Sequence, residues 1–316
     1  MYIIENMTEF HLESPGAVAI GKFDGIHLGH QKLIHKIIEE KKKGRLATVF
    51  TFDTSASAFF GGEEKELTVK AEKRAVFEKM GIDVLIEFPL NPKTAATEPV
   101  EFVRKYLVGQ MKTAYICAGT DLSFGRGGAG NYELLRQYAD VCGYQVELID
   151  KVKVDGEEVS SSRVREAVRS GQMEAATRML GAPYSVSGSV EHGRKFGRTI
   201  GMPTANLVPD QDKLLPPNGV YYSKVLVGEK SYRGVTNIGC KPTVSDLQVM
   251  GVESYLYDFE DTIYGKDITV QLLKFRRPEM KFDGVDSLKA QMQKEIAAGQ
   301  SSQDVADAMC GRYFDE

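Results

Sequence analysis

Two histidines near the start of the chain have the spacing of a phosphate-binding turn. The sequence from Gly21 reads GKFDGIHLGH and places His27 and His30 beside Gly25 and Gly29. Glycines let a backbone approach a ligand closely, and a helix beginning here would offer N–H groups and a positive dipole end to an anion. Both imidazoles could donate hydrogen bonds to phosphate oxygens. A partial metal site is the alternative, but no nearby cysteine or acidic cluster completes tetrahedral coordination.

A second run with phosphate chemistry is VSSSRVR, which begins at Val159. Three hydroxyls at a helix start, followed by two arginines, offer hydroxyl, backbone and guanidinium donors. Alone, such a run is more often a capped helix. Together with the histidine turn it predicts one nucleotide site, in which Arg165 binds the far end of a triphosphate. His35, on the helix after the turn, is predicted to be structural or exposed.

A third candidate site follows residue 188. The stretch from Gly188 to Arg198 alternates glycine with basic residues, which is typical of a flap that covers phosphates. Thr204 and Asn206 then stand two residues apart on an extended segment and face the same side. Their oxygens suit a Mg²⁺ ion held jointly with ATP phosphates. Without further support this segment would be interpreted as a turn.

The elements that must position these residues change character along the chain. Strands are predicted at residues 17–23, 47–52, 83–88, 115–118 and 144–149, and helices at 31–43, 69–80, 99–112 and 132–141. This alternation predicts βαβ units and a parallel, doubly wound, Rossmann-like sheet.

The composition changes after residue 181. Residues 160–181 are predicted to form two short helices that each end in glycine. Residues 184–275 contain short β-type runs separated by glycine and proline, which predict a small antiparallel barrel. The tail at 285–313 is predicted to be helical. We therefore expect two domains, 1–181 and 184–316.

Length and composition exclude several classes of protein. Domains commonly contain about 100–200 residues, so 316 residues suggest two of them. The net charge of −4 argues against a general nucleic-acid binder. No apolar run is long enough to span a membrane, and the N-terminus lacks the pattern of a signal peptide. The four cysteines form no C-x-x-C pair, which favours reduced thiols and a cytoplasmic location.

The histidine turn, the serine–arginine run and the segment GTDLSFGR from Gly119 together resemble the prokaryotic bifunctional riboflavin kinase/FAD synthetase family. The resemblance implies that the first domain transfers AMP from ATP to FMN. His27 and His30 would stabilise the triphosphate, and Asp121 would lie near the flavin. The remaining residues that this resemblance implies in ligand binding are Gly21, Phe23, Asp24, Gly25, Gly29, Ser161, Ser162 and Arg165.

Two features of this half depart from the family pattern, one a three-residue element and the other a single residue. The family usually has a Pro-His-Pro element after the second predicted strand, where this chain has Thr54-Ser55-Ala56. Ser162 stands where threonine is usual, which keeps the hydroxyl. The adenylyl site is thus expected to be intact on its ATP side and altered on its flavin side.

The second half resembles the riboflavin kinase module, a six-stranded Greek-key-type barrel. The resemblance rests on GVY from Gly219, GVTNIG from Gly234, ESYLYDF from Glu253 and RRPEMKF from Arg276. It implies that Thr204 and Asn206 bind Mg²⁺ and ATP and that Glu253 is the general base. Without it, Glu253 would be interpreted as a solvated strand carboxylate. The further ligand-binding residues implied are Gly193, Lys195, Arg198 and Asn237.

The leading hypothesis is therefore a bifunctional enzyme that makes FMN and then FAD with ATP and Mg²⁺. A monofunctional paralogue is one alternative, motivated by the missing Pro-His-Pro element. A non-catalytic flavin or nucleotide sensor is another, because fold does not fix function. The expected partners are small molecules (riboflavin, FMN and ATP), with no nucleic acid and no membrane. The chain is expected to be a monomer or a weak homo-oligomer.

Overall fold

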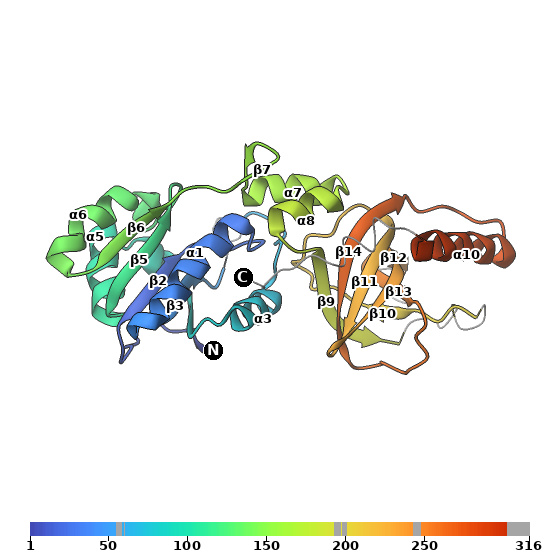
Figure 1. Ribbon diagram of the computed structural model, residues 1–316, viewed down its shortest axis with the longest axis horizontal. Coiled ribbons are helices and arrows are strands. Elements are labelled where there is room, and N and C mark those ends of the chain that lie inside the picture. Colours follow the sequence, from blue (N-terminus) through green and yellow to red (C-terminus); the bar gives the residue numbers. More distant parts are fainter. Residues whose placement is uncertain (55–58, 60, 193–196, 198–200, 243–247, 302–316) are drawn as a thin grey trace. The chain divides into compact units, whose positions relative to one another are not determined.

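Strands and helices alternate through the first part of the chain, as Figure 1 shows. The computed structural model describes residues 1–54, 59, 61–192, 197, 201–242 and 248–301. The chain forms two compact units, Met1–Ser160 and Ser161–Glu316.

The first unit contains a six-stranded parallel sheet in the order β1-β4-β3-β2-β5-β6. Its strands are β1 (Tyr2–Glu5), β2 (Gly16–Ile20), β3 (Leu46–Phe52), β4 (Val84–Phe88), β5 (Thr113–Gly119) and β6 (Gln145–Ile149). The predicted doubly wound parallel sheet is confirmed. Strand β1, which pairs with β4 at the edge, is an addition that the sequence analysis did not predict.

Helices cover both faces of this sheet because its strands are apolar on both sides. On one face, α1 (Leu28–Glu39) and α3 (Lys70–Met80) contribute Leu33, Ile34 and Phe77 to a buried core. A second core lies under α5 (Pro99–Glu101), η2 (Phe102–Gln110) and α6 (Tyr132–Cys142). A regular helix was expected over residues 99–112. The observed η2 is a π-helix, in which Met111 N donates to Tyr106 O at 2.9 Å.

The second unit begins with two short helices, α7 (Ser161–Arg169) and α8 (Met173–Leu180). Its six-stranded closed barrel has antiparallel neighbours in the order β10-β13-β12-β11-β14-β9. The strands are β9 (Tyr184–Glu191), β10 (Ala205–Leu207), β11 (Gly219–Val227), β12 (Lys230–Pro242), β13 (Gln248–Leu256) and β14 (Asp267–Arg277). The predicted antiparallel barrel is confirmed. Helix α10 (Val285–Ser301) packs against β12, and the predicted helical residues beyond it lie outside the described residues.

The two compact units divide before α7, whereas the predicted domain boundary lies after α8. Helix α8 buries Met173, Met179 and Leu180 and packs against β14 and β9 of the barrel. Burial of this apolar face explains why contacts group the helix with the second unit. A functional boundary at 181–184 stays a prediction. Across the residues that the structure describes, no helix combines the length and the apolar character needed to cross a membrane.

Candidate active sites

Strands β2 and β5 mark the point where the parallel sheet changes its winding direction. From β2 the chain adds β3 and β4 on one side, and it then places β5 on the other side of β2. In open α/β sheets, ligands bind outside the carboxyl ends of the strands at such a switch point. The histidine turn follows β2 and the segment from Gly119 follows β5, so the fold brings these two predicted motifs to one edge.

The turn after β2 has an unusual backbone. Phe23, Gly25 and Ile26 all have positive φ values, of 50°, 86° and 43°. Such angles are common for glycine but rare for aromatic or β-branched residues, and they persist only where the surroundings hold them. The Phe23 side chain is fully buried, with its ring centroid 5.2 Å from that of His30 and 5.6 Å from that of Phe77. Any contact between Phe23 and a nucleotide would therefore come from its backbone.

Asp24 ties this turn to a distant part of the chain. Its Oδ1 accepts hydrogen bonds from the backbone N–H groups of Leu67, at 2.8 Å, and Thr68, at 3.2 Å. The segment that leads into α3 is thereby fixed beside the turn. Asp24 was predicted to bind the nucleotide, and that role stays a prediction beside this observed one.

His27 and His30, termed here the histidine pair, lie against each other at the start of α1. Their ring centroids are 3.7 Å apart and their planes are nearly parallel, at 15°. His27 is the N-cap residue of α1, and its Nδ1 accepts the backbone N–H of His30 at 3.3 Å. A Cβ on Gly29 would lie 3.1 Å from the His27 ring, so glycine leaves room for this ring over the first turn. Gly21 similarly faces the ring of Phe23.

Burial keeps both imidazoles neutral near pH 7. Desolvation lowers the pKa of His27 to about 4, although the Asp121 carboxylate opposes the shift. Desolvation also lowers the pKa of His30 well below its usual value, and the neighbouring His27 and Lys73 act in the same direction. Because Nδ1 of neutral His27 accepts a hydrogen bond, its proton lies on Nε2. His27 can therefore donate to a phosphate oxygen from Nε2.

His30 has a polar atom without a partner. Among the residues that the structure describes, its Nδ1 is one of the few buried side-chain nitrogen or oxygen atoms that make no hydrogen bond. Buried polar atoms are generally paired, so such an atom calls for an explanation. The phosphate-binding role of His30 stays a prediction beside this observation.

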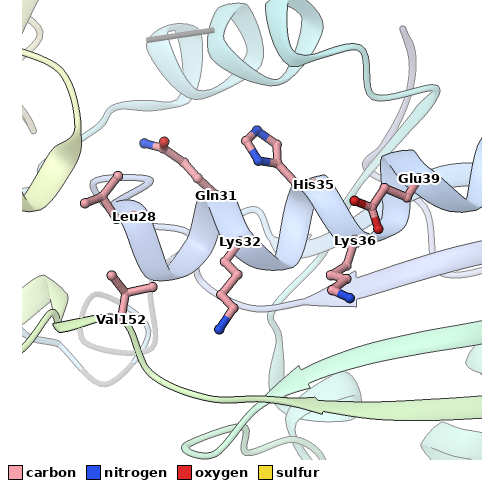
Figure 2. Close-up of a pocket in the computed structure, with 7 residues that line it drawn as sticks. All are labelled: Leu28, Gln31, Lys32, His35, Lys36, Glu39 and Val152. Carbon is pink, nitrogen blue, oxygen red and sulfur yellow. The ribbon is translucent and has the colours of Figure 1, made fainter. Parts of the chain in front are cut away.

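A shallow pocket of about 350 Å³ lies along α1, and Figure 2 shows the residues that line it. Gln31 and His35 lie on one side of the helix, whereas Lys32 and Lys36 lie on the other (Figure 2). Lys36 is paired with Glu147 at 3.1 Å. The pocket thus adjoins the histidine turn through Gln31 but is lined by groups that were not predicted as site residues.

The serine–arginine run starts a helix, as expected. Helix α7 begins at Ser161, so Ser161, Ser162 and Arg165 all lie in its first two turns. These residues belong to the second compact unit. Their predicted meeting with the histidine pair in one nucleotide site stays a prediction.

In the barrel, three neighbouring strands bring the predicted kinase residues into one row. Glu253 on β13 is opposite Asn206 on β10 and opposite Asn237 on β12. Directly opposed residues share a face of the sheet. Val252 and Ser254 are fully buried on either side of Glu253, so the row lies on the outer face of the barrel. We call Asn206, Glu253 and Asn237 the polar row.

The Thr204 and Asn206 side chains suit a magnesium ion. Mg²⁺ prefers oxygen ligands, and the two side chains supply a hydroxyl and an amide oxygen. Asn206 Nδ2 donates to the Thr204 carbonyl at 3.3 Å, which directs the amide oxygen away from that carbonyl. Asn206 is only 9% exposed, as expected for a side chain held in one orientation. The donor set therefore fits the predicted metal.

Glu279 is a candidate site residue that the sequence analysis did not single out. Its Oε1 accepts a hydrogen bond from Asn237 Nδ2 at 3.3 Å, which places a second carboxylate beside the polar row. Glu279 stands in the run RRPEMKF, but its hydrogen bond to Asn237 joins residues 42 apart in sequence and could not be inferred from that run. Gly193, Lys195 and Arg198, predicted to line the flap, lie outside the described residues.

The fold joins a buried histidine turn at the switch point of a parallel sheet to a closed barrel with a carboxylate-centred polar row, and the family comparisons identify the class of protein as a transferase. Residues 10–163 match the FAD synthetase family and residues 180–302 match the riboflavin kinase family. The chain belongs to the bifunctional riboflavin kinase/FMN adenylyltransferase family.

Relatives with that name span almost the whole chain. The protein from Listeria monocytogenes is 36% identical and the one from Bacillus subtilis 35%, and the matches cover 88% and 90% of this chain and 89% and 91% of theirs. A crystal structure described as a macrolide-efflux protein from Streptococcus pneumoniae is 30% identical with a TM-score of 0.84. That match covers 95% of this chain and 99% of that one.

Proposed function

We propose that the protein makes FAD from riboflavin in two ATP-dependent steps. The barrel phosphorylates riboflavin to FMN with release of ADP, and the parallel-sheet unit transfers AMP from a second ATP to FMN with release of pyrophosphate. The observation that carries the proposal is that each matched region has its own polar cluster, the histidine pair in one and the polar row in the other.

In the kinase step, Glu253 takes the proton of the riboflavin 5′-hydroxyl as its oxygen attacks the γ-phosphorus of ATP. The new oxygen–phosphorus bond forms while the bond to the β–γ bridging oxygen breaks, and ADP leaves. The strand register, which pairs Glu253 with Asn206 on one side and Asn237 on the other, supports this role. Thr204 and Asn206 would hold a Mg²⁺ ion, which neutralises phosphate charge when it is bound.

In the adenylyl step, no protein nucleophile is needed because the FMN phosphate attacks the α-phosphorus of ATP. Catalysis then consists of positioning and charge stabilisation. His27 and His30 donate hydrogen bonds to the triphosphate, and the His27 proton lies on Nε2 for this. Both imidazoles act as neutral hydrogen-bonding groups. Ser161, Ser162 and Arg165 would bind further phosphate oxygens.

The test is to separate the flavins after incubating the pure protein with riboflavin, ATP and Mg²⁺, beside a parallel reaction that is fed FMN. The proposal predicts FMN followed by FAD in the first reaction and FAD in the second. Chelation of Mg²⁺ should stop FMN formation. FMN as the sole product from riboflavin, with no FAD from supplied FMN, would instead establish a monofunctional kinase. That second candidate is favoured by the replacement of Pro-His-Pro with Thr54-Ser55-Ala56.

A further inference from the structure

The residue before His27 is held in a conformation that a β-branched side chain rarely adopts. Ile26 has a φ of 43° and is 4% exposed, so its backbone is strained and its side chain is locked in the core. Left-handed angles at such residues persist only where neighbouring groups over-determine them. The group that holds Ile26 therefore also fixes where α1 begins and where the His27 ring points.

Gln31 brackets this turn with two hydrogen bonds. Its backbone N–H donates to the carbonyl of His27 at 3.0 Å, and its side-chain Nε2 donates to the carbonyl of Ile26 at 2.8 Å. The first bond belongs to any α-helix, whereas the second needs a donor on a side chain of this length. Figure 2 shows Gln31 on the first turn of α1.

We propose that Gln31 is a positioning residue for adenylyl transfer, which holds the Ile26 carbonyl so that His27 presents Nε2 to the triphosphate. This inference rests on the proposed function of the histidine pair. Gln31 acts through Ile26 and His27 and need not touch the nucleotide itself.

The test compares Gln31→Met, which keeps the length of the side chain without a donor, with the wild-type enzyme. The control is His35→Gln, one turn further along the same side of α1. We expect Gln31→Met to lower kcat for FAD formation from FMN by about tenfold to a hundredfold, because small misplacements of catalytic groups have effects of that size. The KM for FMN and the riboflavin kinase activity of the same preparation should be unchanged, as should both activities of His35→Gln.

A second variant separates hydrogen bonding from packing. The carboxylate of Gln31→Glu repels the Ile26 carbonyl at neutral pH, but the protonated carboxyl group can donate to it. The adenylyl activity of Gln31→Glu relative to wild type should therefore rise as the pH is lowered from about 8 to about 5.5. An unchanged kcat in Gln31→Met would overturn the proposal, as would a ratio for Gln31→Glu that does not vary with pH.

A readout without turnover distinguishes failure of this inference from failure of the proposed function. The imidazole ¹⁵N signals of His27, assigned by their loss in His27→Asn, should shift in Gln31→Met and stay in place in His35→Gln. Unshifted signals in Gln31→Met would overturn the positioning role even if the wild-type protein made no FAD. Absence of FAD from the wild type would count against the adenylyl reaction alone.

Discussion

His27 and His30 differ from surface histidines because the fold removes them from water while leaving them uncharged. His27 caps α1 through Nδ1, and its ring stacks on that of His30. Both features depend on the turn that Gly29, buried Phe23 and Gln31 hold in place. Two neutral rings can lie in contact without the repulsion that two imidazolium ions would suffer. The pair is thus prepared for an anion through donor geometry, with the positive end of the α1 dipole beneath it.

The pKa of His27 predicts how stability depends on pH. Because its folded pKa of about 4 is below the ordinary 6.5, the unfolded chain binds more protons between these values. Stability therefore falls as the pH is lowered through this window, and His27 accounts for about 2 kcal/mol between pH 7 and pH 5.

The variant His27→Asn checks this, because asparagine keeps the N-cap acceptor and cannot be protonated. Urea midpoints followed by circular dichroism at pH 7 and pH 5 should differ less in the variant than in the wild type. His30 contributes to the pH dependence of stability in both proteins, since burial lowers its pKa as well. Equal pH dependence in the two proteins would contradict the assigned pKa.

For single residues, the sequence indicated candidates for the reaction, whose roles stay predictions, but it did not indicate the contacts that hold them. The spacing of His27 and His30 beside Gly25 and Gly29 is the local signal from which phosphate binding is predicted. The contact of Asp24 with Leu67 was not predictable, because it joins residues 43 apart through a tertiary fold. The same holds for Glu279, whose contact with Asn237 depends on barrel closure.

Among the secondary-structure elements, β1 is attached to the sheet by charge as well as by strand pairing. Arg74 on α3 reaches the Glu87 carboxylate on β4, with its Nε 2.9 Å from Oε1, and it also contacts Glu5 on β1. Although burial opposes ionisation of Glu87, hydrogen bonds from Arg74 and Lys70 lower its pKa overall. The Glu87 side chain is only 4% exposed, so its charge depends on these partners.

We predict that Arg74→Met destabilises the protein by about 3 kcal/mol, because it leaves the buried Glu87 carboxylate with much less compensation. Adding Glu87→Gln to this variant should restore much of the loss, since it removes the charge that lacks a partner. Urea unfolding of the single and double variants measures both effects. If Arg74→Met unfolded at the same urea concentration as the wild type, the ion pairs of Arg74 with Glu87 and Glu5 would contribute nothing to stability.

The barrel interior contains a chain of buried hydroxyls beneath the polar row. Thr236 is 2.7 Å from Ser223 and 2.8 Å from Ser254, oxygen to oxygen, and all three side chains are fully buried. Thr236→Val should cost about 1–3 kcal/mol, because two buried hydroxyls lose a partner. The matched control is Thr269→Val, whose hydroxyl pairs with Ser187 in a half-buried position and should cost less. Equal losses of unfolding free energy in Thr236→Val and Thr269→Val, measured with urea, would contradict the larger contribution assigned to the buried Thr236 hydroxyl.

The order of strands and helices was largely predictable because alternation of apolar segments with glycine-ended helices is a local signal. Strand β1 was not predicted, since only Ile4 of its four residues is fully buried and the ion pairs that hold it are tertiary. The widening of η2 into a π-helix likewise follows from packing that periodicity does not encode. Helix α8 has an apolar face that was evident in the sequence, but the identity of its partner strands was not.

For the whole molecule, one chain contains a region that matches the FAD synthetase family and a region that matches the riboflavin kinase family. The cytoplasmic location, the monomeric or weakly oligomeric state and the absence of nucleic-acid partners stay predictions from composition. The proposed reactions depend on neither the location nor the oligomeric state, because their substrates are small molecules that bind to local cationic or polar groups.

The measurement that tests this account most directly is flavin analysis of two variants, alone and mixed. His27→Ala should convert riboflavin to FMN and stop there, whereas Glu253→Gln should make no FMN from riboflavin but form FAD from supplied FMN. Mixing the two variants with riboflavin, ATP and Mg²⁺ should restore FAD, since free FMN can pass from one to the other. Loss of both activities in either soluble, folded variant would contradict the assignment of two separate sites.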